Sequence, residues 1–226
     1  MSLQVIEIET APHPTASIIV LHGLGADGND FVPIARELDL SAVGPVRFVF
    51  PHAPSRPVTV NGGRVMRAWY DIFGSELGAS AGAVRREDEA GLRASQTLVD
   101  ALIANERARG MPASRIVLAG FSQGCAMTFM AGLRHGERLA GLLGMSGYLP
   151  LAALTAAERG EANAAVPVFQ AHGTGDAVIP IARALQSRDA LVGLGHPVEW
   201  HAYPMAHSVC PPEIADMSRW LSQVLA

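Results

Sequence analysis

A serine between two glycines gives the strongest chemical signal in this sequence. Residues 120–124 read GFSQG, a G-x-S-x-G pattern that follows the apolar run 115–119 and precedes a helical pattern starting at Gln123. Ser122 on such a sharp strand-to-helix turn projects its hydroxyl from the sheet edge, and the glycines leave room where Cβ atoms would clash. The pattern predicts that Ser122 is a nucleophile. A glycine-rich β–α turn without chemistry would give the same five residues.

Two more side chains are placed to support a nucleophilic serine, which needs a base and an acid that orients the base. Asp176 leaves the apolar run 167–171 within the sequence HGTGD, and His207 leaves the strand pattern Val198–Tyr203 within YPMAH. Taken alone, Asp176 also fits a turn or an N-cap, and His207 also fits a surface loop. Together, at successive strand ends, the three residues predict a Ser–His–Asp triad.

An acyl-transfer site also needs backbone N–H groups that bind the oxyanion of the tetrahedral intermediate. One comes from the residue after the nucleophile and another from an early strand–loop junction. Here the strand pattern Ser17–Leu21 runs into HGLGADG at residues 22–28. We therefore expect the backbone N–H groups of Gln123 and Leu24 to bind the oxyanion. His22 is interpreted as a buried histidine that braces this loop.

The elements that must position these residues alternate along the chain. Buried strand patterns lie at 17–21, 46–50, 115–119, 139–145 and 167–171, with a half-exposed strand at 3–9 and another at 198–203. Helical patterns lie at 31–38, 85–109, 123–134, 180–192 and 212–225, and a short helix is expected near 155–161. This alternation predicts an α/β fold with a mostly parallel sheet, helices on both faces and a site at the carboxyl ends of the strands. We expect one domain over residues 1–226.

Composition excludes several classes of function. The 226 residues carry a net charge of −4, and all 17 basic residues are Arg, so Schiff-base chemistry and a P-loop lysine are excluded. No basic stripe suits a nucleic acid, and neither the two cysteines nor any histidine spacing predicts a metal site. No apolar run reaches the roughly 18–20 residues that span a bilayer, so no stable membrane insertion is expected. The N-terminus lacks a signal-peptide pattern, and a cytoplasmic location is the expectation.

The long stretch Pro51–Ala83 is the main candidate for a substrate-binding wall, since long irregular loops in compact domains are usually functional or disordered. Two interpretations of Trp69 and Tyr70 stay equal: they line an acyl-binding groove, or they anchor the loop to the core. Between Ser122 and Asp176 little sequence is left for a lid, which predicts an open, shallow cleft. The candidate substrate-binding residues are Met66, Trp69, Tyr70, Tyr148 and Val178.

Six segments resemble one family over essentially the whole chain: LHGLGADGND, PHAPSRPVTVNGG, AWYDIF, LAGFSQGCAM, HGTGDAVIP and YPMAHSV. They are similar to the small bacterial carboxylesterases and their relatives, the acyl-protein thioesterases and lysophospholipases. The resemblance implies an α/β-hydrolase fold without a cap domain, no cofactor and often a homodimer. It implies Ser122 as nucleophile, Asp176 as acid, His207 as base, and Leu24 with Gln123 as oxyanion donors. One departure is Cys125, which stands where the family more usually has glycine and which we expect to pack beneath the turn.

The sequence therefore predicts a serine carboxylesterase that hydrolyses small-molecule esters of short to medium chain length through an acyl-enzyme. Acyl-protein thioesterase or lysophospholipase activity is the alternative, because the same groups serve both reactions. A binding module on a hydrolase scaffold is the alternative outside enzymes. Such a module would be expected to lack a triad or oxyanion residue, whereas all of these are present in this sequence.

Overall fold

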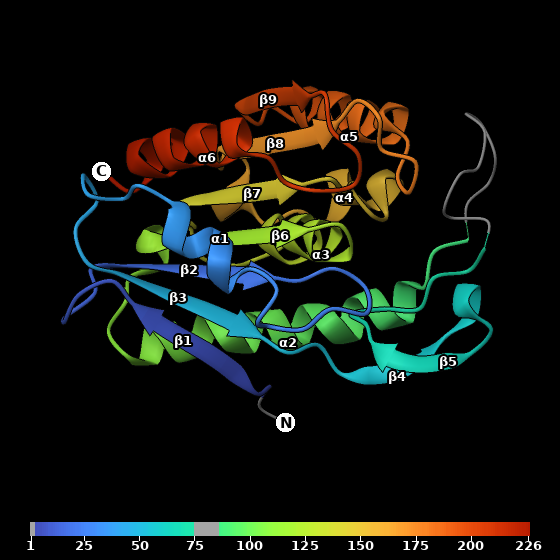
Figure 1. Cartoon of the computed structure of the whole chain (residues 1–226), viewed down its shortest axis with the longest axis horizontal. Coiled ribbons are helices and arrows are strands. Elements are labelled where there is room, and N and C mark those ends of the chain that lie inside the picture. The colour runs from blue at the N-terminus through green and yellow to red at the C-terminus, as the bar shows by residue number, and fades with distance from the viewer. Residues whose placement is uncertain (1–2, 75–85) are drawn as a thin grey trace.

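A seven-stranded sheet forms the centre of the molecule (Figure 1), seen in a computed structural model that describes residues 3–74 and 86–226. The strand order is β1-β3-β2-β6-β7-β8-β9, and only the edge strand β1 runs antiparallel. The strands are β1 Val5–Glu9, β2 Ala16–Leu21, β3 Val46–Pro51, β6 Ile116–Phe121, β7 Gly141–Met145, β8 Val168–Gly173 and β9 Val198–Tyr203. The predicted α/β-hydrolase fold is confirmed.

Helices cover both faces of this sheet. In Figure 1, α1 (Val32–Glu37) and α6 (Pro211–Val224) lie in front, and α2 (Glu89–Ala108) and α3 (Gln123–Gly132) lie behind it. The short α4 (Ala152–Glu158) and α5 (Ile181–Gly193) lie behind the β7–β9 side. Every residue of β2, β7 and β8 is buried. Strands that are covered on both faces are continuous apolar runs, which explains why the sequence pattern located them.

Local sequence signals explain where the longest helix begins and ends. Asp88 caps α2, because its side chain accepts a hydrogen bond from the backbone N–H of Gly91 at 2.9 Å. Gly110 follows the helix with φ of +90°, a conformation that glycine adopts without steric cost. The helix was expected from Arg85, but it begins at Glu89, and Arg85 itself lies outside the described residues.

The stretch expected to be an irregular loop contains a small hairpin. Strands β4 (Ser55–Val58) and β5 (Arg64–Arg67) pair antiparallel around a 3₁₀ turn at Thr59–Asn61. Gly62 and Gly63 both have positive φ values, which allow the chain to reverse there. Residues 75–83 of the expected loop lie outside the described part of the chain. The other 3₁₀ turns are Ala113–Arg115 and Glu161–Asn163.

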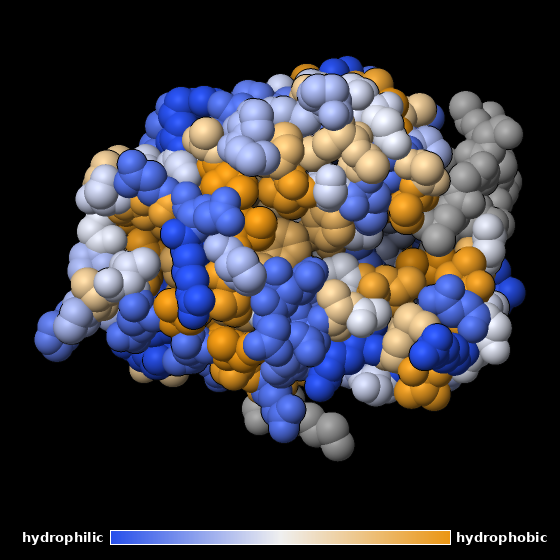
Figure 2. Space-filling model, in the orientation of Figure 1, coloured by the Kyte–Doolittle hydropathy of each residue, from blue (hydrophilic) through white to orange (hydrophobic). Residues whose placement is uncertain are grey.

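Three observations bear on the predictions about a membrane span, the molecular surface and a cap domain. No helix among the described residues is long and apolar enough to cross a membrane. Apolar side chains reach the surface between α1 and α6 in Figure 2, where the short α1 leaves part of the front face of the sheet thinly covered. Residues 146–167, between β7 and β8, hold only α4 and one 3₁₀ turn, as expected for a fold without a cap.

Candidate active site

Ser122 sits on a strained turn between β6 and α3. Its φ of 55° and ψ of −115° are unusual for a residue with a side chain, and strain of this kind is typical of functional sites. A Cβ at Gly124 would lie 1.9 Å from the Leu21 carbonyl oxygen, and one at Gly120 would lie 2.2 Å from the carbonyl oxygen of Gly124. Glycine is therefore required at 124 for the close packing of this turn against the end of β2, and at 120 for the close packing of β6 against the start of α3.

A chain of hydrogen bonds joins the three residues that the motifs indicated. Nε2 of His207 lies 2.9 Å from Oγ of Ser122, and Nδ1 of His207 lies 2.7 Å from Oδ2 of Asp176. The other carboxylate oxygen of Asp176 accepts hydrogen bonds from the backbone N–H groups of Val178 at 2.8 Å and Ile179 at 2.9 Å. Ser122 and Asp176 are 9% and 8% exposed, so the chain of bonds is shielded from water, and Ser122 and His207 line a hollow through which a substrate can reach them.

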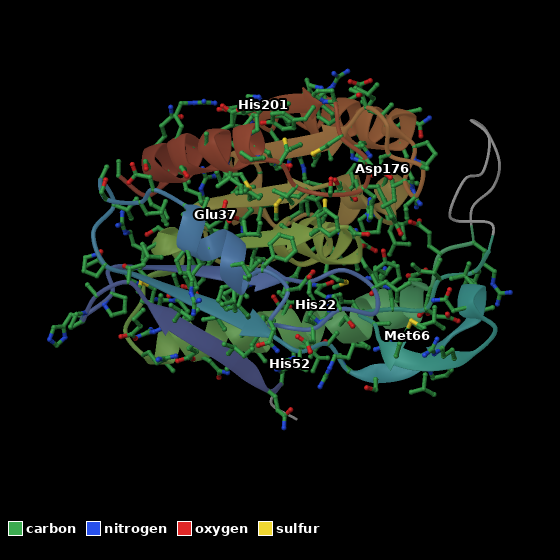
Figure 3. The ribbon with its side chains drawn as sticks, in the orientation of Figure 1. His22, Glu37, His52, Met66, Asp176 and His201 are labelled. Atoms are coloured by element: carbon green, nitrogen blue, oxygen red, sulfur yellow. The ribbon has the colours of Figure 1, made fainter. Side chains whose placement is uncertain are left out.

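The turn after β8 is packed closely against the loop that carries His207. Thr174 N–H donates to the Tyr203 carbonyl at 2.8 Å, and Gly175 N–H donates to the Met205 carbonyl at 3.0 Å. A Cβ at Gly173 would lie 2.4 Å from the carbonyl oxygens of Met205 and Ala206. Glycine at position 173 is thus needed for this close approach, which brings Asp176 to His207. Figure 3 shows Asp176 beyond the carboxyl end of β8.

Backbone N–H groups at the start of α3 and in the loop after β2 lie next to the serine. Gln123 is the first residue of α3, where N–H groups have no partner within the helix. Leu24 lines the same hollow as Ser122. The loop of Leu24 is fixed from both sides, because Gly25 N–H donates to the Arg67 carbonyl at 2.9 Å and Gly28 N–H donates to Nδ1 of His52 at 3.1 Å. These two bonds hold the backbone around Leu24 in a fixed position, which its predicted role as an oxyanion donor beside Gln123 requires.

His22 braces this loop from within. It is 1% exposed, and burial lowers the pKa of its imidazole below the usual value. Nε2 accepts a hydrogen bond from the Ala53 backbone N–H at 3.0 Å, so the ring proton sits on Nδ1, which lies 2.7 Å from the Gly23 carbonyl. Both ring nitrogens are thus used by the backbone, in agreement with the structural role expected for His22.

A hollow of about 280 Å³ opens above Ser122. Its lining is mostly apolar, with Asp30 and His207 as the polar side chains beside the serine; the lining residues are Gly23, Leu24, Ala26, Asp30, Ile72, Phe121, Ser122, Val178 and His207. The Phe121 ring packs 4.8 Å from the His207 ring, centre to centre. Of the five candidate substrate-binding residues, Val178 lies in this lining and is 45% exposed.

Trp69, Tyr70 and Tyr148 do not line this hollow, because they are buried, with exposures of 0%, 1% and 3%. Trp69 Nε1–H donates to the His22 carbonyl at 3.0 Å, and the hydroxyls of Tyr70 and Tyr148 lie 2.7 Å apart. These contacts support the interpretation that Trp69 and Tyr70 anchor their loop to the core. Met66 is half-buried on β5, on the hairpin to the right in Figure 3, and is also absent from the lining.

Five residues that line the hollow were not predicted as site residues: Gly23, Ala26, Asp30, Ile72 and Phe121. Phe121 is part of the GFSQG motif itself, and Asp30 ends the conspicuous segment LHGLGADGND, so both had a signal in the sequence. Within residues 3–74 and 86–226, no group of three or more His, Cys, Asp or Glu residues is arranged to hold a metal ion.

The fold and the serine turn define the chain as an α/β hydrolase. It belongs to the phospholipase/carboxylesterase family, whose model matches residues 2–225. Acyl-protein thioesterase 1 from Neurospora crassa is 41% identical over 93% of this chain and 87% of its own length. The protein of the same name from Yarrowia lipolytica is 38% identical over 92% of both chains. These relatives are fungal and therefore do not support the bacterial part of the resemblance.

Solved structures agree with this assignment. Arabidopsis thaliana SOBER1 superposes with a TM-score of 0.86 at 30% identity, covering 93% of this chain and 99% of the other. Zea mays acyl-protein thioesterase 2 superposes with a TM-score of 0.84 at 27% identity, covering 99% of both chains. With the family model, these relatives show that the chain is a serine hydrolase of this family.

Proposed function

We propose that this protein is a serine carboxylesterase that hydrolyses short- to medium-chain esters through an acyl-enzyme formed on Ser122. The observation that carries the proposal is the unbroken chain of hydrogen bonds from Ser122 through His207 to Asp176, at 2.9 and 2.7 Å. Family membership supports ester hydrolysis but leaves the substrate open.

In the proposed mechanism, Nε2 of His207 takes the proton of the Ser122 hydroxyl as its oxygen attacks the ester carbonyl. The backbone N–H groups of Leu24 and Gln123 bind the oxyanion, and the alcohol leaves with the proton held by His207. Water then gives a proton to His207 and attacks the acyl-enzyme, which releases the acid and restores Ser122. Asp176 keeps the ring proton of His207 on Nδ1 and stabilises the imidazolium.

The size and lining of the hollow support the proposed substrate class. A volume of about 280 Å³ is slightly below the roughly 300–1,000 Å³ usual for small-ligand sites, and its apolar wall suits an acyl chain of limited length. A second candidate function is hydrolysis of thioesters on acylated proteins, which the names of the relatives favour, or of lysophospholipids, which the name of the family favours. Both reactions need the same groups around Ser122, so chain length and leaving group distinguish them.

The test is hydrolysis of p-nitrophenyl esters with two to sixteen acyl carbons, beside a palmitoyl thioester, by the wild type and by Ser122→Ala. A maximum at short chains that disappears with Ser122→Ala supports the proposal. Preference for the palmitoyl thioester supports the second candidate. A protein that neither hydrolyses esters nor reacts with a fluorophosphonate probe at Ser122 would be a binding module on a hydrolase scaffold.

A further inference from the structure

His172 is a buried histidine that contacts the acid of the proposed triad. It is the fifth residue of β8, directly before the turn that carries Asp176, and it is fully buried. Its Nε2 lies 2.8 Å from the Ile179 carbonyl oxygen and 3.3 Å from Oδ2 of Asp176. Oδ2 is also the oxygen that Nδ1 of His207 contacts at 2.7 Å. Two histidines thus share one carboxylate oxygen.

The position of the ring proton on His172 follows from its neighbours. The Ile179 carbonyl oxygen can only accept a hydrogen bond, so Nε2 carries the ring proton and donates it to Ile179, with Oδ2 of Asp176 3.3 Å from the same nitrogen. Its Nδ1 is buried and has no hydrogen-bond partner among the described residues, so it has no group to stabilise a second proton. Burial lowers the pKa of His172, which keeps the ring neutral.

We propose that His172 is a positioning residue for ester hydrolysis: its Nε2–H, held by the Ile179 carbonyl beside Oδ2 of Asp176, shares the charge of that carboxylate and limits how strongly it attracts the imidazolium of His207. The proposal rests on the proposed function, since it assigns His172 to the same triad. One oxygen of Asp176 accepts from the backbone N–H groups of Val178 and Ile179. The other lies 2.7 Å from Nδ1 of His207 and 3.3 Å from Nε2 of His172.

Among the described residues, few titratable groups face His172 and His207. Asp176 and His207 act electrostatically on His172. His207 faces Asp176, the Ser122 hydroxyl and the Phe121 ring, and Asp30 lines the same hollow from the loop after β2. Without the Nε2–H of His172, the negative charge of Asp176 is shared with one fewer N–H group. Asp176 then stabilises the imidazolium of His207 more strongly, so His207 becomes the neutral base only at a higher pH.

The experiment compares His172→Phe with His172→Gln by kcat/KM against pH for p-nitrophenyl butyrate. Phe keeps the ring shape without a donor, whereas the Gln amide nitrogen can replace Nε2–H. We expect the acidic limb of His172→Phe to move upward by about half a pH unit or more and that of His172→Gln to stay at the wild-type position. His196→Phe is the matched control, because His196 is also a buried histidine, with Nδ1 3.3 Å from the Val166 carbonyl.

Thermal unfolding checks that each variant is folded, and fluorophosphonate labelling checks that Ser122 is intact. A limb that does not move in His172→Phe, or that moves equally in His172→Gln, overturns the role of His172. If His172→Phe does not fold, a shifted limb in His172→Gln overturns the proposal and an unshifted limb supports it. Activity that survives Ser122→Ala would instead overturn the proposed function, so the two failures are distinguishable.

Discussion

Oε1 of Gln123 accepts a hydrogen bond from the backbone N–H of Trp69 at 2.8 Å. The amide nitrogen of the same side chain donates to the Tyr70 carbonyl, also at 2.8 Å. Gln123 directly follows the proposed nucleophile, so one buried side chain ties the turn of Ser122 to the loop before α2. The backbone and the side chain of Gln123 therefore have different tasks, which a substitution can separate.

We expect Gln123→Ala to lower the free energy of unfolding by about 2 kcal/mol or more, because two buried backbone groups lose their partners. The backbone N–H at position 123 remains, so fluorophosphonate labelling of Ser122 should persist at a reduced rate. Urea unfolding and labelling kinetics measure the two effects. The exposed Gln186, changed to Ala, is the control. Equal free energies of unfolding for Gln123→Ala and Gln186→Ala would contradict the role of the Gln123 side chain in joining the Ser122 turn to the loop before α2.

Asp176→Asn should reduce kcat by about 10⁴-fold while the protein stays folded. The amide cannot hold the His207 ring in the required tautomer, although it can still accept from the backbone N–H groups of Val178 and Ile179. Steady-state kinetics together with circular dichroism measure this. Asp189→Asn on the exposed side of α5 should leave kcat unchanged, and a loss below tenfold at Asp176 would refute its assignment as the acid.

Val178→Phe should move the preference for ester substrates toward shorter acyl chains, because the larger side chain fills part of the hollow above Ser122. The ratio of kcat/KM for acetyl and octanoyl p-nitrophenyl esters is the measurement. Val192, which is 54% exposed on α5, provides the matched control Val192→Phe. An unchanged ratio would mean that the acyl chain does not contact Val178.

Stability should fall as pH rises from about 4.5 to about 8, owing to Glu213. Burial raises the pKa of this carboxyl from 4.5 to about 8, and the Cys210 backbone N–H offsets part of the shift. In that window the folded state keeps a proton that the unfolded state releases, so the free energy of unfolding decreases with pH. Urea midpoints at pH 5 and pH 8 should differ less in Glu213→Gln than in the wild type. The exposed Glu161→Gln should behave as the wild type does, and identical differences in all three would refute the assignment.

Much of the fold could be predicted because its signals are local. Central parallel strands are covered on both faces, and continuous apolar runs such as 17–21 and 167–171 reveal them. The end of α2 was predicted from Gly110, whereas its start was expected at Arg85 and lies at Glu89, after the Asp88 cap. The hairpin at Ser55–Arg67 was not predicted, since its short strands carry little apolar alternation and their pairing depends on the turn at Gly62.

The sequence left the roles of Trp69 and Tyr70 undecided and placed Tyr148 in a wall of the groove, because the burial of all three depends on contacts with distant residues. The indole of Trp69 binds the carbonyl of His22, 47 positions away, and Tyr70 meets Tyr148 across 78 positions. An aromatic side chain in a long loop suits a groove wall and a core anchor equally well. The contacts that decide between them form only when the sheet and α2 are assembled.

The sequence by itself determined the order of the main strands and helices along the chain, the need for glycines around Ser122 and the positions of Asp176 and His207 after their strands. These depend on backbone conformation and burial, which nearby residues encode. Only the tertiary structure decided that His172 shares a carboxylate oxygen with His207, and that Arg47 on β3 pairs with the buried Glu106 on α2 at 2.9 Å. Both depend on distances of a few ångströms between elements far apart in the chain, which packing alone sets.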